Sequence, residues 1–207
     1  MITGRSRAGV DAAVTVLAEK AGDVARVAGA VTDVRDRAAV DATVAEAVAA
    51  LGGLDTLVNN AGVGVFTEVA SMTDEEWSRV IDTNLTGAFY CSRAALPEMK
   101  RAGGGWIINI ASLAGRNYFA TAGAYCASKA GLIAFSEALM LEVRELGIRV
   151  SVIMPGSVAT GFSGRNAGAD DSWKLTPADV ADVVMDLLRH PSRSLPSKVE
   201  IRPARTR

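Results

Sequence analysis

Residues 106–112 read Trp-Ile-Ile-Asn-Ile-Ala-Ser, a short apolar run that ends in small and polar residues. Such a run, rich in β-branched side chains, is typical of a strand that is buried on both faces of a parallel sheet. The run itself predicts a strand at 106–110. Further strands are expected at residues 24–31, 54–58, 148–154 and 198–201.

Helix-length stretches separate these runs. They cover residues 9–20, 37–51, 73–100 with at least one break, 124–146 and 177–189, the last with Thr176 as a plausible N-cap before Pro177. Strands that alternate with helices predict βαβ units, a parallel sheet and helices on both faces. The length of 207 residues fits one domain, and no linker or repeat divides it, so we expect a single domain over 1–207.

Composition excludes several classes of function. The formal net charge is −1, which argues against a nucleic-acid partner. One histidine and two cysteines leave almost nothing for a metal site or for Ser-His or Cys-His catalysis, so no metal is expected. No run approaches the ~20 apolar residues of a membrane span, and the start lacks the apolar core of a secretory signal, which predicts a cytoplasmic protein.

Tyr125 and Lys129 carry the most specific chemistry. Four positions apart in a helix, their side chains share one face, so the phenol and the ammonium point the same way. A phenol with a pKa near 10 is a poor acid or base at neutral pH, and a nearby cation lowers that pKa. The pair therefore predicts a proton donor and acceptor at Tyr125, although the spacing alone also occurs by chance.

Other candidate residues follow predicted strands, where open α/β sheets bind their ligands. Without a histidine to activate it, Ser112 is expected to donate a hydrogen bond to substrate rather than to act as a nucleophile. Asn84 interrupts a helical stretch in which asparagine is unfavourable. The alternative interpretations are a turn serine for Ser112, a helix cap or kink for Asn84, and ordinary turns for the other residues that follow strands. The remaining candidates at strand ends are Asp33, Val34, Asn60, Ala61, Gly62, Pro155, Gly156, Val158 and Thr160.

In order and spacing, this set resembles the short-chain dehydrogenase/reductase family over nearly the whole chain. The resemblance implies a Rossmann-type doubly wound parallel sheet, a three-layer α/β/α fold and a bound NAD or NADP. It also implies that Tyr125 protonates a carbonyl oxygen during hydride transfer and that Ser112 holds that oxygen. Lys129 would lower the Tyr125 pKa and bind the nicotinamide ribose, and Asn84 would position a relay water.

The resemblance also assigns the cofactor contacts. Asp33 and Val34 would meet the adenine, and Asn60, Ala61 and Gly62 the adenosine side. Val158 and Thr160, after Pro155 and Gly156, would contact the nicotinamide end.

The chain departs from the family at its start. The family opens with a strand and a turn of the form Thr-Gly-x-x-x-Gly-x-Gly, which binds the pyrophosphate. Residues 3–6 fit better as the end of the family's second strand, so the first strand, the glycine turn and the first helix are expected to be missing. The strand at 24–31 would then be separated from that at 54–58. Either the protein starts upstream of Met1, or this product binds cofactor weakly.

The same alignment bears on cofactor and partners. Arg5 stands where an acidic residue would bind the ribose of NAD, which favours NADP with NAD as the alternative. We expect a small carbonyl or alcohol substrate, with Leu113, Phe119 and Phe162 among the candidate walls. We also expect a homodimer or homotetramer through apolar residues of the helical stretches 73–100 and 124–146, namely Phe89, Leu132, Phe135, Leu139 and Leu141. The alternative functions are a truncated or non-catalytic relative and, less favoured, another nucleotide-binding α/β protein such as a methyltransferase.

Overall fold

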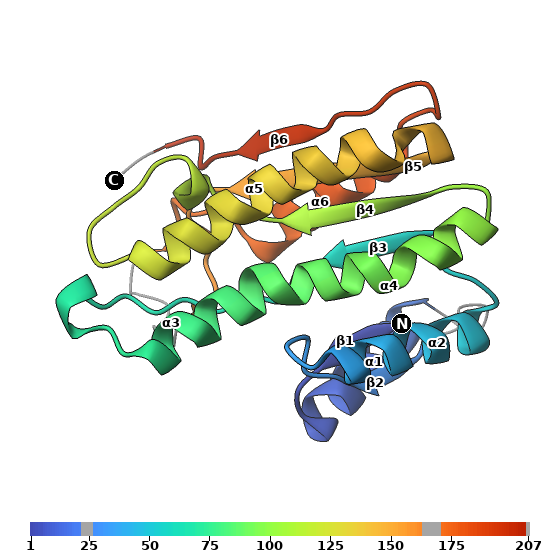
Figure 1. The fold of residues 1–207 in the computed structure, drawn as a ribbon, viewed down its shortest axis with the longest axis horizontal. Coiled ribbons are helices and arrows are strands. Elements are labelled where there is room, and N and C mark those ends of the chain that lie inside the picture. The colour runs from blue at the N-terminus through green and yellow to red at the C-terminus, as the bar shows by residue number, and fades with distance from the viewer. Residues whose placement is uncertain (22–26, 163–170, 206–207) are drawn as a thin grey trace.

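The computed structural model describes residues 1–21, 27–162 and 171–205 (Figure 1). Its strands are all parallel to their neighbours, as the alternation predicts. One sheet has the order β3 (Thr56–Asn59), β4 (Gly105–Ile110), β5 (Ile148–Pro155) and β6 (Lys198–Ile201), and a separate pair joins β1 (Ile2–Gly4) to β2 (Gly29–Val31).

Helices connect the strands. They are α1 (Arg7–Ala21), α2 (Arg37–Leu51), η1 (Val69–Ser71), α3 (Asp74–Ile81), η2 (Asp82–Thr86), α4 (Gly87–Arg101), η3 (Leu113–Gly115), α5 (Gly123–Val143), η4 (Arg144–Leu146) and α6 (Pro177–Leu188). Thr176 caps α6 as predicted. Its hydroxyl oxygen accepts a hydrogen bond from the backbone N–H of Asp179, and the Asp179 carboxylate accepts one from the backbone N–H of Thr176.

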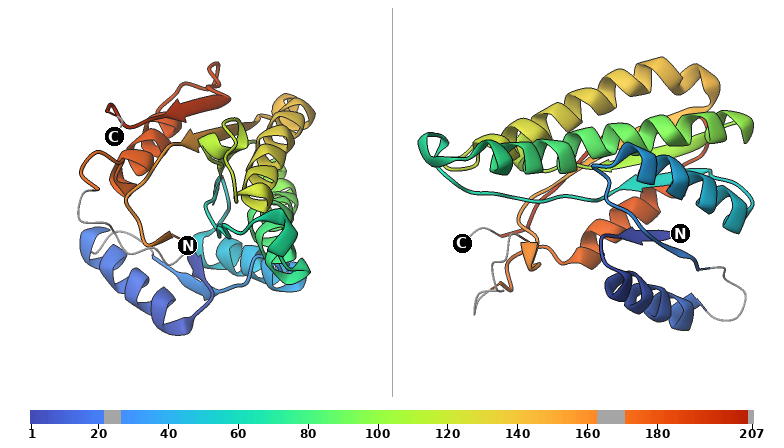
Figure 2. Two further views of the ribbon diagram at one scale, coloured as in Figure 1. Left: turned by 90° about the vertical axis from the view of Figure 1, so that its left-hand side faces the viewer. Right: turned by 60° about the horizontal axis from the view of Figure 1, so that its bottom comes forward.

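The layers are those of a doubly wound α/β protein, with helices on both faces of the larger sheet (Figures 1 and 2). On one face, Leu132 of α5 packs with Val152 of β5. On the other face, Trp106 and Ile153 pack with Leu187 of α6. The predicted three-layer arrangement is therefore confirmed.

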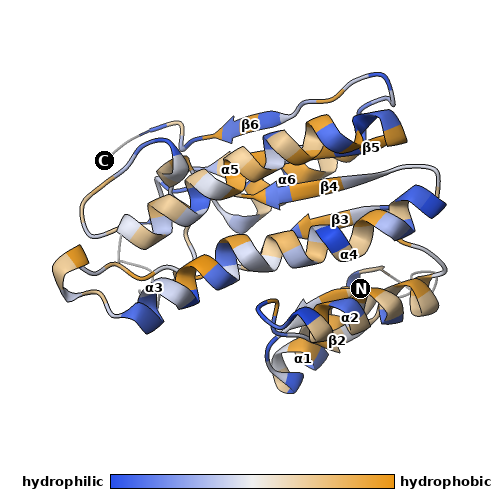
Figure 3. Cartoon of the chain, viewed as in Figure 1, coloured by the Kyte–Doolittle hydropathy of each residue, from blue (hydrophilic) through white to orange (hydrophobic). Residues whose placement is uncertain are grey.

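Strands β4 and β5 form the centre of the core. Trp106, Ile107 and Ile108 are buried, as are Val150 and Val152. The hydropathy colouring shows hydrophobic residues along part of β4 (Figure 3). Burial on both faces is what the unbroken apolar run at 106–110 predicts.

The expected break in the helical stretch 73–100 is a π-helical turn. Residues Asp82–Thr86 form η2 between α3 and α4. Such turns place one extra residue in a helical turn and are frequent at functional sites. The turn carries Asn84, which explains why this asparagine stands in a helical stretch.

The sheet is divided in the part of the chain that the structure describes. Thr3 and Gly4 form the end of a strand that pairs with β2, as expected, and the β1–β2 pair has no strand contact with β3. The strand expected at 24–31 covers Gly29–Val31, and residues 24–26 lie outside the described residues. The predicted separation of this strand from β3 is thus present.

Across residues 1–21, 27–162 and 171–205, we find no helix with both the length and the apolar character that crossing a membrane requires.

Candidate active site

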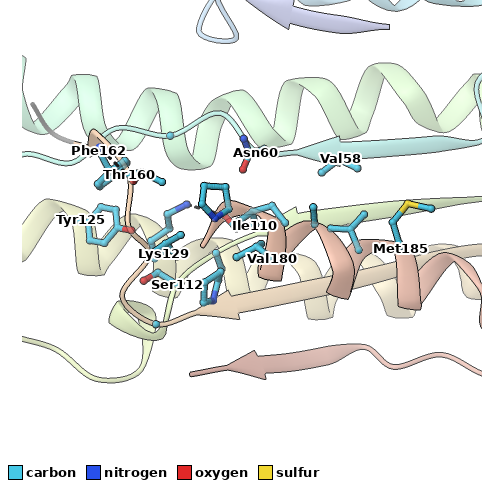
Figure 4. Close-up of a pocket in the computed structure, with 18 residues that line it drawn as sticks. Val58, Asn60, Ile110, Ser112, Tyr125, Lys129, Thr160, Phe162, Val180 and Met185 are labelled. Atoms are coloured by element: carbon cyan, nitrogen blue, oxygen red, sulfur yellow. Dashed lines mark hydrogen bonds between the residues drawn. The ribbon is translucent and has the colours of Figure 1, made fainter. Parts of the chain in front are cut away.

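A cavity of about 770 Å³ lies at the carboxyl ends of β3, β4 and β5 (Figure 4). Its size is that of a ligand pocket. Nine of the predicted site residues line it together. They are Asn60, Gly62, Ser112, Tyr125, Lys129, Pro155, Gly156, Val158 and Thr160. Residues from the ends of three strands that are far apart in sequence therefore meet, as a parallel sheet with crossover helices requires.

Ser112 lies directly beyond β4 and caps η3. Its hydroxyl oxygen accepts a hydrogen bond of 3.1 Å from the amide of Ala114. That bond orients the hydroxyl and leaves its proton available as a donor. This arrangement suits a residue that holds a substrate oxygen. Ser112 is at the same time a turn serine, which was the alternative interpretation.

Tyr125 lies in the first turn of α5. Burial raises the pKa of its phenol above the ordinary value, while a hydrogen bond with Ser112 acts in the opposite direction. The phenol is therefore a protonated group at neutral pH, placed beside the serine hydroxyl in the same cavity. A protonated phenol can donate its proton to a carbonyl oxygen.

Lys129 is almost completely buried, with 4% of its surface exposed. Its Nζ donates a hydrogen bond of 2.8 Å to the carbonyl oxygen of Ile110. Burial lowers its pKa to about 8. A buried amine with that pKa can hold or release a proton near physiological pH.

The pKa of Tyr125 differs from the expectation that Lys129 lowers it. Lys129 Nζ lies 6.0 Å from the centre of the Tyr125 ring, and burial determines the direction of the Tyr125 pKa shift. The phenol pKa is raised rather than lowered, because removing the phenolate from water costs more than the neighbouring groups recover.

Asn84 is held rigidly and has 1% of its surface exposed. Its Oδ1 accepts a hydrogen bond of 2.8 Å from the backbone N–H of Val63. Its Nδ2 donates hydrogen bonds to the Val63 carbonyl oxygen and to Ser128 Oγ. The side chain thus fastens η2 to the segment after β3 and to α5. Asn84 Oδ1 and Lys129 Nζ both lie close to Gly62, but Asn84 is not among the residues that line the cavity.

Gly62 lies close to Asn84 and Lys129 at the cavity. A Cβ atom there would come within 3.4 Å of Asn84 Oδ1 and 3.7 Å of Lys129 Nζ. The small residues Gly62 and Gly156 and the polar side chains of Asn60 and Thr160 fit the nicotinamide half of a dinucleotide.

Of the residues predicted for the adenosine half, Asn60 and Gly62 line the active-site cavity, whereas Asp33, Val34 and Ala61 do not. Val34 and Ala61 line a second cavity, together with Asn60. The Asp33 carboxylate binds the Arg35 guanidinium at 2.6 Å, which lowers its pKa to about 2. Arg5, at the end of β1, is exposed, and its charge also contributes to this lowered pKa. The structure thus brings Arg5 and Asp33 near each other, beyond the ends of β1 and β2.

The family assignment follows from comparison of the sequence with known proteins. The sequence profile of the short chain dehydrogenase family matches residues 1–170. The chain belongs to the short chain dehydrogenase family.

Members of this family resemble the chain in sequence and in structure. A hexahydro-indene-carboxyl-CoA reductase of Mycobacterium tuberculosis is 41% identical over 146 residues, which span 70% of this chain and 56% of that protein. An alcohol dehydrogenase of the archaeon Thermococcus sibiricus, complexed with 5-hydroxy-NADP, superposes with a TM-score of 0.90 at 25% identity, covering 100% of this chain and 86% of that one. A metagenomic short-chain oxidoreductase in complex with NADP has a TM-score of 0.84 and 33% identity, covering 99% and 86%.

Aromatic rings surround the phenol of this short chain dehydrogenase. The Tyr125 ring lies 5.7 Å from that of Phe66 and 5.6 Å from that of Phe162, and Phe66 lies 5.9 Å from Phe119. Of the wall residues expected from the sequence, Phe162 lines the cavity, whereas Leu113 and Phe119 do not. Phe66 was missed, because it stands in an irregular segment after β3 where no periodic pattern marks it.

Helix α6 contributes a wall that the sequence did not indicate. Val180, Val184 and Met185 line the cavity, and Figure 4 shows Val180 and Met185 among its lining side chains. The spacing of four and five positions would have placed these apolar residues on one face of a helix. In the sequence, this apolar face has the same pattern as a helix face that packs into the core. Its contact with the cavity is therefore visible only in the three-dimensional structure.

Proposed function

We propose that the chain is an NADP-dependent oxidoreductase that interconverts a carbonyl and an alcohol, with Tyr125 as general acid and base. The observation that supports this most strongly is the presence of Ser112, Tyr125 and Lys129 in one cavity whose polar side chains and glycines suit a nicotinamide. Two similar solved proteins carry NADP or an NADP analogue, which supports the choice of cofactor.

The proposed chemistry divides between the protein and the bound cofactor. The nicotinamide, when bound, supplies or accepts the hydride at the substrate carbon. Ser112 donates its hydroxyl proton in a hydrogen bond to the substrate oxygen. Tyr125 transfers its phenolic proton to that oxygen in reduction and takes it back in oxidation, and Lys129 binds the ribose and supplies a proton to the phenolate. Asn60, Gly62, Val158 and Thr160 hold the nicotinamide end.

The preference for NADP favours carbonyl reduction as the working direction, and the protonated phenol of Tyr125 is the form that this direction uses. A phenol that keeps its proton at neutral pH is ready to protonate a carbonyl oxygen, whereas oxidation requires the phenolate. The walls formed by Phe162, Val184 and Met185 are apolar, which suits an uncharged ketone or aldehyde carbon skeleton.

Turnover of NADPH with a panel of ketones and aldehydes tests this function. We expect oxidation of NADPH that depends on the carbonyl compound and yields the corresponding alcohol in equal amount. Consumption of NADPH without alcohol, or no consumption while NADPH is bound, would count against the proposal. It would favour instead the non-catalytic relative, for which the divided sheet is the supporting observation.

Arg5 provides a test of cofactor preference. Its exposed guanidinium at the end of β1 is placed to pair with the 2′-phosphate of NADP. Arg5→Ala should weaken NADPH binding about tenfold and leave NADH binding within about twofold, as measured by fluorescence titration. Arg37→Ala removes an equally exposed arginine on α2 and serves as the control. Equal losses for both cofactors would contradict the assignment.

A further inference from the structure

Ser128 stands in α5 between Tyr125 and Lys129 in sequence, but it does not line the active-site cavity. It is completely buried, with 0% of its surface exposed. Its Oγ donates a hydrogen bond of 2.8 Å to the backbone carbonyl oxygen of Tyr125 and accepts one of 3.0 Å from Nδ2 of Asn84. One hydroxyl thus connects the first turn of α5 with the π-helical turn η2.

The chemistry of these groups fixes the direction of both hydrogen bonds. A side-chain amide nitrogen only donates, and a backbone carbonyl oxygen only accepts. The Ser128 hydroxyl must therefore accept the bond from Asn84 and give its own proton to the carbonyl of Tyr125. The amide of Asn84 cannot turn around, because its Oδ1 already accepts the backbone N–H of Val63. The chain of bonds consequently has one arrangement.

Close packing next to this chain of bonds holds η2 and α5 in one register. Leu85, which follows Asn84 on η2, lies against Gly131 of α5. A Cβ atom added at Gly131 would lie only 2.8 Å from Cδ2 of Leu85. This contact is about one helical turn beyond Ser128. A steric contact and a hydrogen bond one turn apart leave the two segments little freedom to slide against each other.

The bonds of Ser128 complete a ring that ends at Lys129. Asn84 binds both the N–H and the C=O of Val63, the residue that follows Gly62. A Cβ atom added at Gly62 would lie 3.7 Å from Lys129 Nζ. Since Ser128 is the peptide neighbour of Lys129, its hydroxyl links the backbone at the lysine to the segment after β3. The position of the ammonium relative to that segment therefore depends on this hydroxyl.

Ser151 of β5 provides a structural counterpart of Ser128. It is also 0% exposed. Its Oγ accepts a hydrogen bond of 2.9 Å from Trp106 Nε1 and donates one of 2.8 Å to the backbone carbonyl oxygen of Pro196. Neither partner lines the active-site cavity. The two serines thus share burial and bonding, and they differ in what they hold.

We propose that Ser128 is a positioning residue for the reaction at Tyr125 and Lys129. Its hydroxyl holds the first turn of α5 against η2, so that the phenol and the ammonium keep one position relative to Ser112 and Gly62. The inference rests on the proposed function and adds to it a residue that lies outside the active-site cavity.

Kinetics of matched variants test this role. Ser128→Ala removes the link, and Ser151→Ala removes the counterpart. With NADPH and carbonyl substrate, at a temperature at which both variants are folded, kcat should fall at least about tenfold in Ser128→Ala, because displaced catalytic groups react slowly. The KM of the carbonyl substrate should stay within about twofold, since Ser128 does not line the cavity. Ser151→Ala should keep kcat within about twofold of the wild type.

A second measurement reads the position of Lys129 without turnover. Reductive methylation by formaldehyde and a borohydride modifies accessible lysine amines, and mass spectrometry follows each lysine separately. Lys129 should react at least about threefold faster in Ser128→Ala than in the wild type, because local opening exposes its amine. Its rate in Ser151→Ala should equal that of the wild type. Ser128→Cys keeps a weak donor and a weak acceptor and should give intermediate values in both measurements.

The two measurements separate this inference from the proposed function. If the wild type reduces no carbonyl compound, the proposed function fails, and the methylation rates alone decide whether Ser128 positions Lys129. The inference is overturned if Ser128→Ala keeps the wild-type kcat or the wild-type methylation rate of Lys129. It is also overturned if Ser151→Ala changes them as much. Should Ser128→Ala not fold, Ser128→Cys takes its place, and wild-type values in that variant overturn the inference.

Discussion

At the scale of single residues, Lys129 shows how the site is built at the expense of stability. Its ammonium is buried beside one carbonyl oxygen, and its pKa falls to about 8 from 10.5. Between these two pH values the unfolded chain binds more protons than the folded chain. The free energy of unfolding contributed by this group therefore rises with pH over that window.

Replacing Lys129 with methionine should make this cost visible. Relative to the Lys129→Met variant, the wild type should gain up to about 3 kcal/mol of unfolding free energy from pH 8 to pH 10.5. Urea unfolding at both pH values measures it. The raised pKa values of Tyr125 and Cys91 affect both proteins alike and cancel in the difference. A difference that stays constant with pH would show that Lys129 is not a desolvated ammonium.

Which residues form the site could be predicted from the sequence, but the pKa shifts of those residues could not. The positions of Ser112, Tyr125 and Lys129 at one cavity follow from strand ends and helical spacing. The direction of the Tyr125 pKa shift does not, because it depends on burial that only the packed rings of Phe66 and Phe162 reveal. Asn84 could be recognised as an irregular position, whereas its bonds to Val63 and Ser128 required the π-helical turn.

At the scale of elements, η2 depends on Asn84. Its side chain makes three hydrogen bonds in a buried setting, to Val63 N–H, Val63 C=O and Ser128 Oγ. Asn84→Ala leaves these partners unsatisfied and should lower the unfolding free energy by about 2–4 kcal/mol, measured by urea unfolding. Asn117→Ala, at an exposed asparagine, should change it by less than about 0.5 kcal/mol. Equal effects would mean that η2 is held by its own backbone.

Element boundaries in the core could be predicted closely where a pattern is unbroken. The run at 106–110 became β4, and the capped stretch from 177 became α6. The stretch 73–100 was harder, because the π-helical turn keeps a helical appearance in the sequence while it adds one residue to a turn. Helix α6 could be placed but not assigned to the site, since its contact with the cavity is a tertiary feature.

At the scale of the whole molecule, the face formed by α4 and α5 is the candidate surface for self-association. These helices lie side by side on one side of the larger sheet (Figure 1). Of the residues expected there, Leu132 and Leu139 are core residues, whereas Phe89 and Leu141 are exposed by 39% and 60%. Sequence patterns could not separate the two groups, because α5 is apolar around most of its circumference.

The oligomeric state provides the corresponding prediction. We expect the chain to be a homodimer or homotetramer, because burying Phe89 and Leu141 against a second copy removes apolar surface from water. Light scattering after size exclusion should give a multiple of the chain mass for the wild type and the single-chain mass for a Phe89→Glu, Leu141→Glu variant. The same mass for both proteins would place the interface elsewhere or exclude one.

The divided sheet is the feature of the whole molecule that the sequence predicted best. In the described residues, the chain passes from the short strand β1 through the helix α1 to β2. The separation of the β1–β2 pair from β3 followed from the strand order of the family alone. The 41% exposure of Val31 and of Val58 did not follow, because exposed valines on strands look like core residues in a sequence.

The central claim, that the Tyr125 phenol transfers the proton to the substrate oxygen, is tested most directly by one substitution. Tyr125→Phe removes only the hydroxyl, and Tyr118→Phe removes the hydroxyl of a tyrosine that is 70% exposed. With the active carbonyl substrate and saturating NADPH, kcat should fall at least about a hundredfold in Tyr125→Phe, within the range for loss of a general acid. It should stay within about twofold in Tyr118→Phe. A Tyr125→Phe enzyme that binds NADPH and turns over at the wild-type rate would contradict the account.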